Sequence, residues 1–392
     1  MMKLFSANKI ANIAFKNHII RSATAENMAD DFGRPNKELI KKYELLAKGN
    51  IGGIITGNIA ITQSAKPMKE PHILVLDSDD KIPYFQALTQ HIHSLNTPII
   101  AQLTHCGGQG ERDDAIAPSK VSDYKAREMS EEEIFQVIDD FAQAILRAKK
   151  SGFDGVQLHC SHGFLLSAFF SPRTNKRKDQ WGGDTINRTR IALHIIQKAR
   201  DLVGDFPILA KINGYETLKG GIDLKEGVRV AKKLKEYGFD GIEVSNGMLK
   251  AGMATVRGNV PSEILLALDP KFAKIPRFLK PFLARVVKFF IPQPKPTQNF
   301  NLSSAKMIKD HIKIPVIVVG GITDLKDMQE IIDNNMADFI SLARPLIIEP
   351  NFVKKLQEGR AERSRCIQCN FCVIGSLYEP LKCYYGKIPK DL

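Results

Sequence analysis

The strongest constraint on the fold is a repeating alternation of short apolar runs with longer amphipathic stretches. Runs this apolar are typical of strands buried on both faces of a parallel sheet. The stretches between them, such as 130–151 and 185–203, have helical periodicity. Eight strand–helix units are the number that closes a (β/α)8 TIM barrel of class α/β. The eight runs are residues 18–22, 53–57, 98–103, 155–159, 207–212, 241–245, 315–319 and 339–342.

Polar residues and glycines gather at the carboxyl ends of these runs. A barrel collects its active site from the carboxyl ends of many strands at once, whereas a doubly wound sheet, the competing fold, needs fewer units. The pattern therefore favours the barrel. The residues in these positions are Ser22, Thr56, Gln102, His159, Lys211, Ser245, Gly320 and Arg344.

Two segments do not fit the repeat. Residues 246–301 follow the sixth run, are too long for a simple loop, and contain IPRFLKPFLARVVKFF at 275–290. This basic and apolar segment could be an active-site lid or a membrane-surface helix, but we favour a helix packed on the barrel flank. We expect a barrel over residues 1–360, with 246–301 as an insertion or lid, and a cysteine-containing C-terminal arm over 361–392.

Composition limits the partners and the location. The 392 residues carry a net charge of +13, and much of the excess lies between Lys250 and Lys295. We see no nucleic-acid motif and expect no nucleic-acid partner. No apolar run reaches the roughly 20 residues that span a bilayer, and residues 1–17 lack a secretory signal, so we expect a cytoplasmic protein. Its six cysteines are then thiols or metal ligands rather than disulfides.

The segment that carries most chemistry begins where the fourth run ends. His159 closes that run and His162 follows three residues later. Two imidazoles at a strand-to-loop corner could both donate N–H groups to one carbonyl oxygen or to the oxyanion formed from it. They could instead bind a metal with a third ligand, which would indicate a metal-dependent hydrolase.

The other strand ends add charge and hydrogen-bonding groups to the same mouth. Lys211 is an ammonium that needs an anionic or electron-rich partner when buried, and Gln102 offers an amide. Glycines after the seventh strand and Arg344 after the eighth form the usual phosphate-binding corner of a barrel. Together these groups suit a phosphorylated cofactor with a hydrogen-bonding ring system, and a carbonyl substrate beside it.

Several stretches resemble a known family. They include NHIIRSATAENMADDFGRPN, IAQLTHCGGQ, FPILAKINGYE, IPVIVVGGI and the combination HxxHG…SPxxNKRxDxxGG within 159–183. In these the chain is similar to the Old Yellow Enzyme, or NADH:flavin oxidoreductase, family, and to its bacterial single-domain branch. That family consists of FMN-containing barrels in which NAD(P)H reduces the flavin and the flavin reduces activated alkenes.

The resemblance implies a role for each matching residue. His159 and His162 would bind the carbonyl oxygen of the substrate. Lys211 would lie beside the flavin atom N1, and Gln102 would hydrogen-bond the pyrimidine part of the ring. The remaining cofactor-binding residues would be Ser22, Ala23 and Thr24 against the ring, Gly57 at its polar edge, and Gly320, Gly321, Ala343 and Arg344 around the phosphate.

One position departs from the family. Many members have a tyrosine two residues after the second histidine, and it protonates the substrate's α-carbon; here that position is Phe164. A phenyl ring cannot give a proton. Water, Cys160, Ser161 or Tyr215 would have to do so, or α-protonation is not part of the reaction. We interpret Phe164 as an aromatic wall of the substrate pocket.

The C-terminal arm contains a second motif. Cys366, Cys369 and Cys372 are spaced by two residues and Cys383 follows, a set that could hold an iron–sulfur cluster or zinc. Larger relatives carry such a cluster beside a second flavin domain, but usually with three residues before the third cysteine, and this chain ends where that domain would begin. We therefore expect reduced thiols rather than a cluster.

The sequence thus predicts an FMN-dependent NAD(P)H oxidoreductase acting on α,β-unsaturated carbonyl compounds or quinone-like acceptors. The first alternative is a metal-dependent barrel hydrolase that uses the HxxH pair. The second is a catalytically weak barrel that acts as a surface-binding protein through its basic segment. Self-association and weak contact with a membrane surface stay open.

Overall fold

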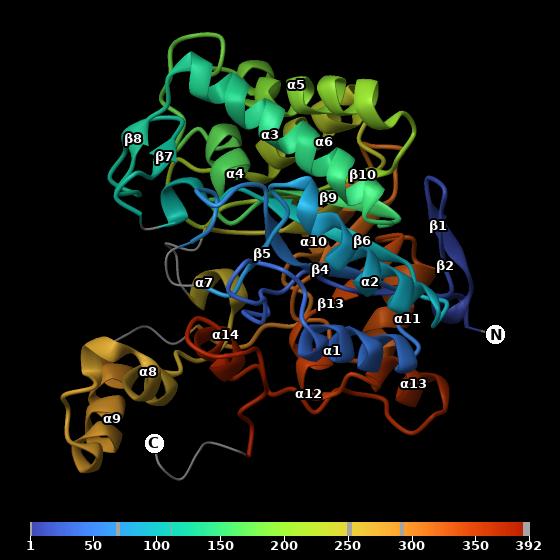
Figure 1. The fold of residues 1–392 in the computed structure, drawn as a ribbon. Helices are drawn as coiled ribbons and strands as arrows, with labels where there is room; N and C mark the ends of the chain where they lie inside the picture. Colours follow the sequence, from blue (N-terminus) through green and yellow to red (C-terminus); the bar gives the residue numbers. More distant parts are fainter. Residues whose placement is uncertain (1, 68–70, 111, 249–252, 291–293, 387–392) are drawn as a thin grey trace.

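The computed structural model describes residues 2–67, 71–110, 112–248, 253–290 and 294–386 (Figure 1). In this part of the chain, eight parallel strands pair in a ring that closes through β13–β3 and β3–β4. The predicted (β/α)8 barrel is therefore confirmed. Its strands are β3 (Ile19–Arg21), β4 (Gly53–Ala60), β6 (Ile99–Thr104), β9 (Gly155–Cys160), β10 (Ile208–Asn213), β11 (Gly241–Ser245), β12 (Val316–Val319) and β13 (Phe339–Leu342).

Helices surround the ring where the amphipathic stretches predict them. The longest, α3, begins with a capping box: Ser130 accepts from the amide of Glu133, whose carboxylate accepts from the amide of Ser130. Gly238 ends α6 with φ 97°, the left-handed conformation that glycine adopts without strain. The helices between strands are α1 (Lys37–Lys48), α2 (Ile82–His93), α3 (Glu131–Lys150), α4 (Leu165–Phe170), α5 (Thr185–Val203), α6 (Leu224–Tyr237), α10 (Leu302–Lys309) and α11 (Leu325–Asp333), with α12 (Arg344–Ile348) and α13 (Phe352–Gln357) after the last strand.

A hairpin at the start of the chain closes the amino-terminal end of the barrel. Strands β1 (Asn8–Ile10) and β2 (Ile13–Phe15) are antiparallel and pack Ile10 and Phe15 against apolar residues at the starts of the barrel strands. This small core includes Ile20, Leu209 and Phe339. With one end plugged, the carboxyl ends of the strands are left to form the site. Short strands elsewhere are β5 (Leu74–Val75), β7 (Ile116–Ala117) and β8 (Arg127–Glu128).

The insertion and the arm lie together at the carboxyl end. The insertion contains α7 (Met253–Val256), α8 (Ser262–Leu268) and α9 (Lys280–Phe290), and α8 contacts α14 (Phe371–Gly375) of the arm. Helix α9 packs on α8 and extends away from the barrel, rather than lying on its flank as expected (Figure 1). Positions 250–252 and 291–293 of the basic stretch between Lys250 and Lys295 fall outside the described residues. None of the described helices has both the length and the apolar character that crossing a bilayer requires.

Candidate active site

A cavity of about 300 Å³ opens at the carboxyl ends of β3, β10, β11, β12 and β13. Its volume is at the lower end of the range for cofactor and ligand pockets. The insertion contributes Thr255 and Phe300 to its wall, and the arm contributes Cys366, Gln368 and Leu377. Eleven residues that the sequence singles out line it: Ser22, Ala23, Thr24, His162, Lys211, Ser245, Gly320, Gly321, Ala343, Arg344 and Cys366.

Strand register explains how charged groups come together beneath this cavity. Lys211 on β10 pairs with His159 on β9 and with Glu243 on β11. Residues that pair across neighbouring strands project their side chains to the same face of the sheet. The register therefore brings an imidazole, an ammonium and a carboxylate side by side inside the barrel.

Lys211 has the anionic partner that its burial requires. Its Nζ lies 3.5 Å from Oε1 of Glu243 and donates to Oγ of Ser22 at 3.0 Å. Ser22 in turn donates to the same carboxylate oxygen at 2.7 Å. Burial pushes the pKa of Glu243 up, but the ammonium of Lys211 and hydrogen bonds from serine and glutamine side chains outweigh it, so the pKa lies below its ordinary value. These contacts therefore favour the carboxylate form of Glu243.

The two histidines meet edge to face, with ring centroids 5.3 Å apart. His162 has a left-handed backbone (φ 62°) and is followed by Gly163 at φ 83°, which explains the glycine of the HxxHG motif. Nε2 of His162 lies 2.8 Å from Oγ of Ser245. Burial, reinforced by Lys211, lowers the pKa of His162 to about 3. Burial, His162 and Lys211 also hold the pKa of His159 well below its usual range, so both rings are neutral donors.

Phe164 lies directly against the first histidine. Its ring stacks on that of His159 with centroids 4.3 Å apart and planes 28° apart, and only 8% of the residue is exposed. Phe164 is the N-cap of α4: its carbonyl accepts from the amide of Ala168 at 2.7 Å, and its own amide donates to the carbonyl of Ser161 at 3.2 Å. The phenyl group thus forms an apolar wall beside the histidine pair.

Two predicted cofactor residues lie outside the cavity lining. Gly57 donates its amide to the hydroxyl of Tyr43 at 3.0 Å, and a side chain at this position would collide with Glu26. The amide group of Gln102 donates to Gln157 at 2.7 Å, which donates to Glu243 at 2.8 Å. In this structure Gln102 thus belongs to a polar chain across the barrel interior.

Arg344 provides the test of whether a phosphorylated cofactor fits. Its guanidinium is largely buried and donates to neutral oxygens: the carbonyl of Arg257 at 3.0 Å, Oδ1 of Asn370 at 2.6 Å and Oε1 of Gln368 at 3.3 Å. Within the described chain it forms no ion pair with a carboxylate. Because a buried cation without a counter-charge is unfavourable, an anionic group in the adjoining cavity would be stabilised here. The residues present therefore fit the phosphate of FMN.

The four cysteines of the arm come together beside the same arginine. Cys366, Cys369, Cys372 and Cys383 line one small cavity with Arg344. None of the four forms a disulfide within the described chain, and burial raises the pKa of Cys366, and that of Cys372 to about 12. Across the described ranges, no three His, Cys, Asp or Glu side chains converge on the position of a single metal ion.

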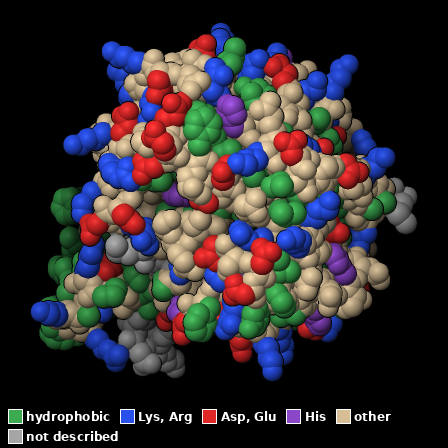
Figure 2. Space-filling view, turned by 45° about the horizontal axis from the view of Figure 1, so that its top comes forward, with side chains coloured by type: hydrophobic (Ala, Val, Ile, Leu, Met, Phe, Trp, Pro, Cys, Tyr) green, Lys and Arg blue, Asp and Glu red, His purple; other side chains and the backbone are tan. Residues whose placement is uncertain are grey.

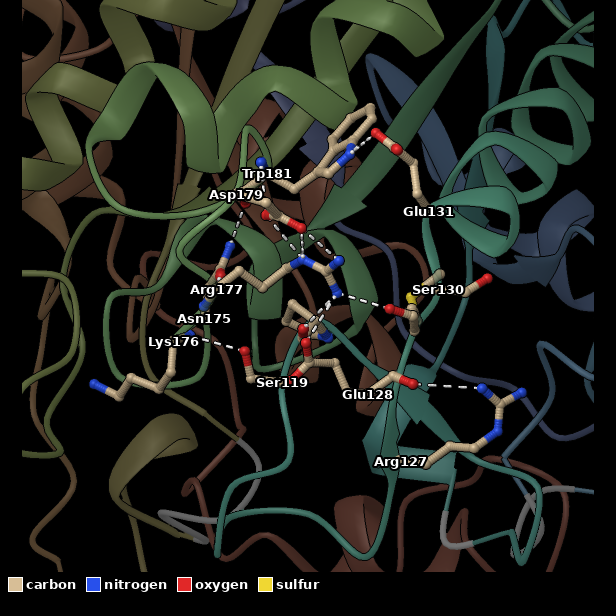
Figure 3. Close-up of polar contacts among 12 residues, drawn as sticks. Ser119, Arg127, Glu128, Ser130, Glu131, Asn175, Lys176, Arg177, Asp179 and Trp181 are labelled. Carbon is tan, nitrogen blue, oxygen red and sulfur yellow. Dashed lines mark hydrogen bonds and ion pairs between the residues drawn. The ribbon is translucent and has the colours of Figure 1, made fainter.

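The SPxxNKRxDxxGG part of the motif is a structural clamp (Figure 3). Arg177 pairs with Asp179 at 2.7 Å and Glu128 at 3.4 Å, and donates to the carbonyl of Met129 at 2.7 Å. The side chain of Asn175 donates to the carbonyl of Trp181 at 2.8 Å. These contacts tie the loop after α4 to the β7–β8 segment, outside the cavity.

Sequence reasoning missed the polar residues in the middle of the strands. Glu243 in GIEVS, Gln157 in GVQLHC and Ser341 in FISLA are buried and bonded to one another through the carboxylate of Glu243. A charged residue within a run that is otherwise apolar was the available signal, because burial of a carboxylate demands a partner.

Comparison with known proteins agrees with this geometry. The chain matches the NADH:flavin oxidoreductase / NADH oxidase family over residues 3–268 and 283–363. It is 32% identical to an NADH oxidase of Thermoanaerobacter brockii over 391 residues, covering 97% of this chain and 54% of that protein. It is 31% identical to an NADPH dehydrogenase of Halalkalibacterium halodurans, covering 89% of this chain and 92% of that protein.

Solved structures share the fold. The old yellow enzyme homologue of Zymomonas mobilis superposes with a TM-score of 0.71 at 22% identity, covering 98% of this chain and 99% of that one. A 2-naphthoyl-CoA reductase superposes with a TM-score of 0.78 at 23% identity, covering 97% and 56%. The chain spans about half the length of some relatives it matches, the NADH oxidase among them. On the family match, supported by the barrel and its cavity, the chain belongs to the NADH:flavin oxidoreductase / NADH oxidase family.

Proposed function

We propose that this chain is an FMN-dependent oxidoreductase that takes hydride from NAD(P)H and passes it to an α,β-unsaturated carbonyl compound or a quinone-like acceptor. Family membership supports the flavin chemistry. The observation that carries the proposal is the cavity itself, whose lining includes Arg344, which pairs with no carboxylate among the described residues, together with Lys211 and His162. FMN, when bound, would supply the hydride transfer.

The residues of the cavity have separate tasks in this proposal. Arg344, with backbone at Gly321, would hold the phosphate, and Ser22–Thr24 with Lys211 would hold the ring. The fixed ammonium of Lys211 would stabilise negative charge near its edge. Neutral His159 and His162 would donate to the substrate's carbonyl oxygen, and such donors stabilise the developing enolate.

The proton for the substrate's α-carbon needs another source. Cys160 is fully buried and burial raises the pKa of its thiol, so it is a poor acid. Ser161 lies 3.2 Å from Nδ1 of His159, and Tyr215 lies 3.5 Å from the guanidinium of Arg257 outside the cavity lining. We therefore assign this proton to water that enters the cavity.

The reaction suits a cytoplasmic enzyme with a small-molecule substrate. The cytoplasm supplies NAD(P)H and keeps thiols reduced. The hydrolase alternative has no comparable support, because the family is one of oxidoreductases and the described His, Cys, Asp and Glu residues form no site for a single metal ion.

Titration of the apoprotein with FMN tests the phosphate site. Arg344→Gln should weaken FMN binding about 10- to 100-fold, since a hydrogen bond to a charged group contributes about 1.5–3 kcal/mol. Arg360→Gln is the matched control, because Arg360 is an exposed arginine paired with Glu358. Failure of the wild-type protein to bind FMN, or equal affinity of the two variants, would reject the proposal.

A second cofactor is favoured by the convergence of the arm cysteines. We propose, against the sequence-based expectation, that Cys366, Cys369, Cys372 and Cys383 hold an iron–sulfur cluster. Four thiols that surround a shared cavity without meeting at one ion suit a polynuclear cluster better than zinc. Anaerobic purification should give bound iron that Cys369→Ser removes and that Cys106→Ala, a buried cysteine elsewhere, retains. Iron-free wild-type protein would reject this assignment.

A further inference from the structure

Four phenylalanine side chains are exposed on the insertion. The exposed fraction is 80% for Phe278, 64% for Phe282, 84% for Phe289 and 77% for Phe290. Phenylalanine is among the residues most often buried, so a group of four in one short segment marks an interaction surface. We call residues 262–290 the α8–α9 segment.

The outer face of α9 is separate from the face that packs. Ala284 is buried, its carbonyl accepts from Oγ of Ser262 at 3.0 Å, and Lys288 pairs with Glu263, so this side of α9 is fixed on α8. Phe282 and Phe289 are seven residues apart, which places them on one side of the helix. That side lies away from the Ala284 side, which explains their exposure.

The same segment is strongly basic. Residues 270–290 contain six basic residues and no acidic one: Lys271, Lys274, Arg277, Lys280, Arg285 and Lys288. Figure 2 shows hydrophobic side chains gathered at the left edge of the molecule, beside Lys and Arg side chains. A partner for this surface must therefore accept aromatic rings and carry negative charge.

The family match leaves part of this segment out. The matched residues, 3–268 and 283–363, omit 269–282, which include Phe278 and Phe282. In the structure this part continues into a helix that extends beyond the barrel (Figure 1). The part of the surface that carries Phe278 and Phe282 is thus outside the family match, and residues 262–290 are absent from the cavity lining of the proposed reaction site.

We propose that the α8–α9 segment docks the protein on the surface of an anionic lipid bilayer. Exposed phenylalanines enter the boundary between headgroups and acyl chains, as they do in interfacial helices, while the lysines and arginines bind anionic headgroups. The attachment is peripheral and reversible, because a short helix with one apolar face lies in the interface plane.

Vesicle co-sedimentation of the full-length holoprotein tests this. Vesicles of phosphatidylcholine with 30% phosphatidylglycerol should carry the protein into the pellet, and raising the salt concentration from 0.05 M to 0.5 M should release it, because salt screens the charges. The variant Phe282→Ser/Phe289→Ser/Phe290→Ser should partition at least tenfold less. Phe32→Ser is the matched control, since Phe32 is 65% exposed outside the segment; it should bind as wild type.

Folding and self-association are checked on the same samples. Unchanged circular dichroism and FMN content would show that the triple variant is folded. The proposal is overturned if anionic vesicles leave the wild type in solution, if the triple variant pellets equally, or if pure phosphatidylcholine binds as well. If the wild type does not bind vesicles but forms a dimer in size-exclusion chromatography, and the triple variant is a monomer, the surface binds a second copy of the chain instead.

Discussion

The ammonium of Lys211 lies 3.5 Å from Oε1 of Glu243, and both groups are almost completely buried where β10 meets β11. The carboxylate also accepts from Ser22 and Ser341, which leaves few unfilled acceptor positions on it. The ammonium of Lys211, which lines the cavity, is therefore held in a fixed position by these buried contacts. Catalysis of hydride transfer benefits from such preorganised charge, because no reorganisation is needed during the reaction.

Glu243→Gln should reduce the free energy of unfolding by about 3–5 kcal/mol, because it leaves the ammonium of Lys211 buried without a counter-charge. Urea denaturation measures this. The double variant Lys211→Met/Glu243→Gln should recover much of the loss, since both charges are then gone. If the double variant is as unstable as the sum of the two single variants, the pair does not couple.

Stability should fall as the pH is lowered from about 6.5 towards 3, with His162 as one contributor. The unfolded chain takes up a proton at this histidine near its ordinary pKa of 6.5, whereas the folded protein does so only at about 3. The unfolded state thus binds more protons in this window, so unfolding is favoured as pH falls. His162→Asn, which tolerates the left-handed backbone, should flatten the slope. An unchanged slope in urea titrations at several pH values would contradict the low pKa.

Phe164→Tyr should accelerate the reaction of the reduced holoenzyme with 2-cyclohexenone at least about tenfold, since a positioned acid commonly contributes 10²–10⁴. The new hydroxyl would be carried by the ring that stacks on His159. Anaerobic stopped-flow measurement of flavin reoxidation gives the rate, with Phe135→Tyr as an exposed control. No acceleration would mean that protonation by this residue does not limit the rate.

Arg177→Met should cost about 2–4 kcal/mol of stability without affecting FMN affinity. The change removes the donors to the carbonyls of Pro118 and Met129, and unsatisfied buried acceptors are unfavourable. Arg127→Met, which breaks an exposed pair with Glu133, should cost less than about 1 kcal/mol. Loss of FMN binding in folded Arg177→Met would assign this motif to the site instead.

Periodicity and spacing predicted the barrel closely, because the apolar residues of each strand already indicate within a short stretch of sequence that the strand is buried. The expected run 241–245 is β11, and the expected helix 185–203 is α5, with the same bounds. Strand ends also pointed to Lys211 and Arg344, since a barrel brings its carboxyl ends to one mouth. The local sequence pattern was sufficient to predict these features.

Contacts between distant segments could not be predicted in this way. The partner of Lys211 lies 32 residues away on the next strand, and the partners of Arg344 lie in the insertion and the arm. The motif around Arg177 carried the family resemblance, but the pattern did not show that its residues form a clamp outside the cavity. The outcome at such positions depends on tertiary packing, which spacing along the chain does not record.

The C-terminal arm forms part of the cavity wall, and this affects the order in which the site is assembled. Ser22 and Leu381 line the same space although nearly the whole polypeptide lies between them. A nascent chain that has completed only its eight strands still lacks one side of the pocket. We therefore expect FMN to be loaded only after the arm, with α14, has been synthesised and has docked on the barrel.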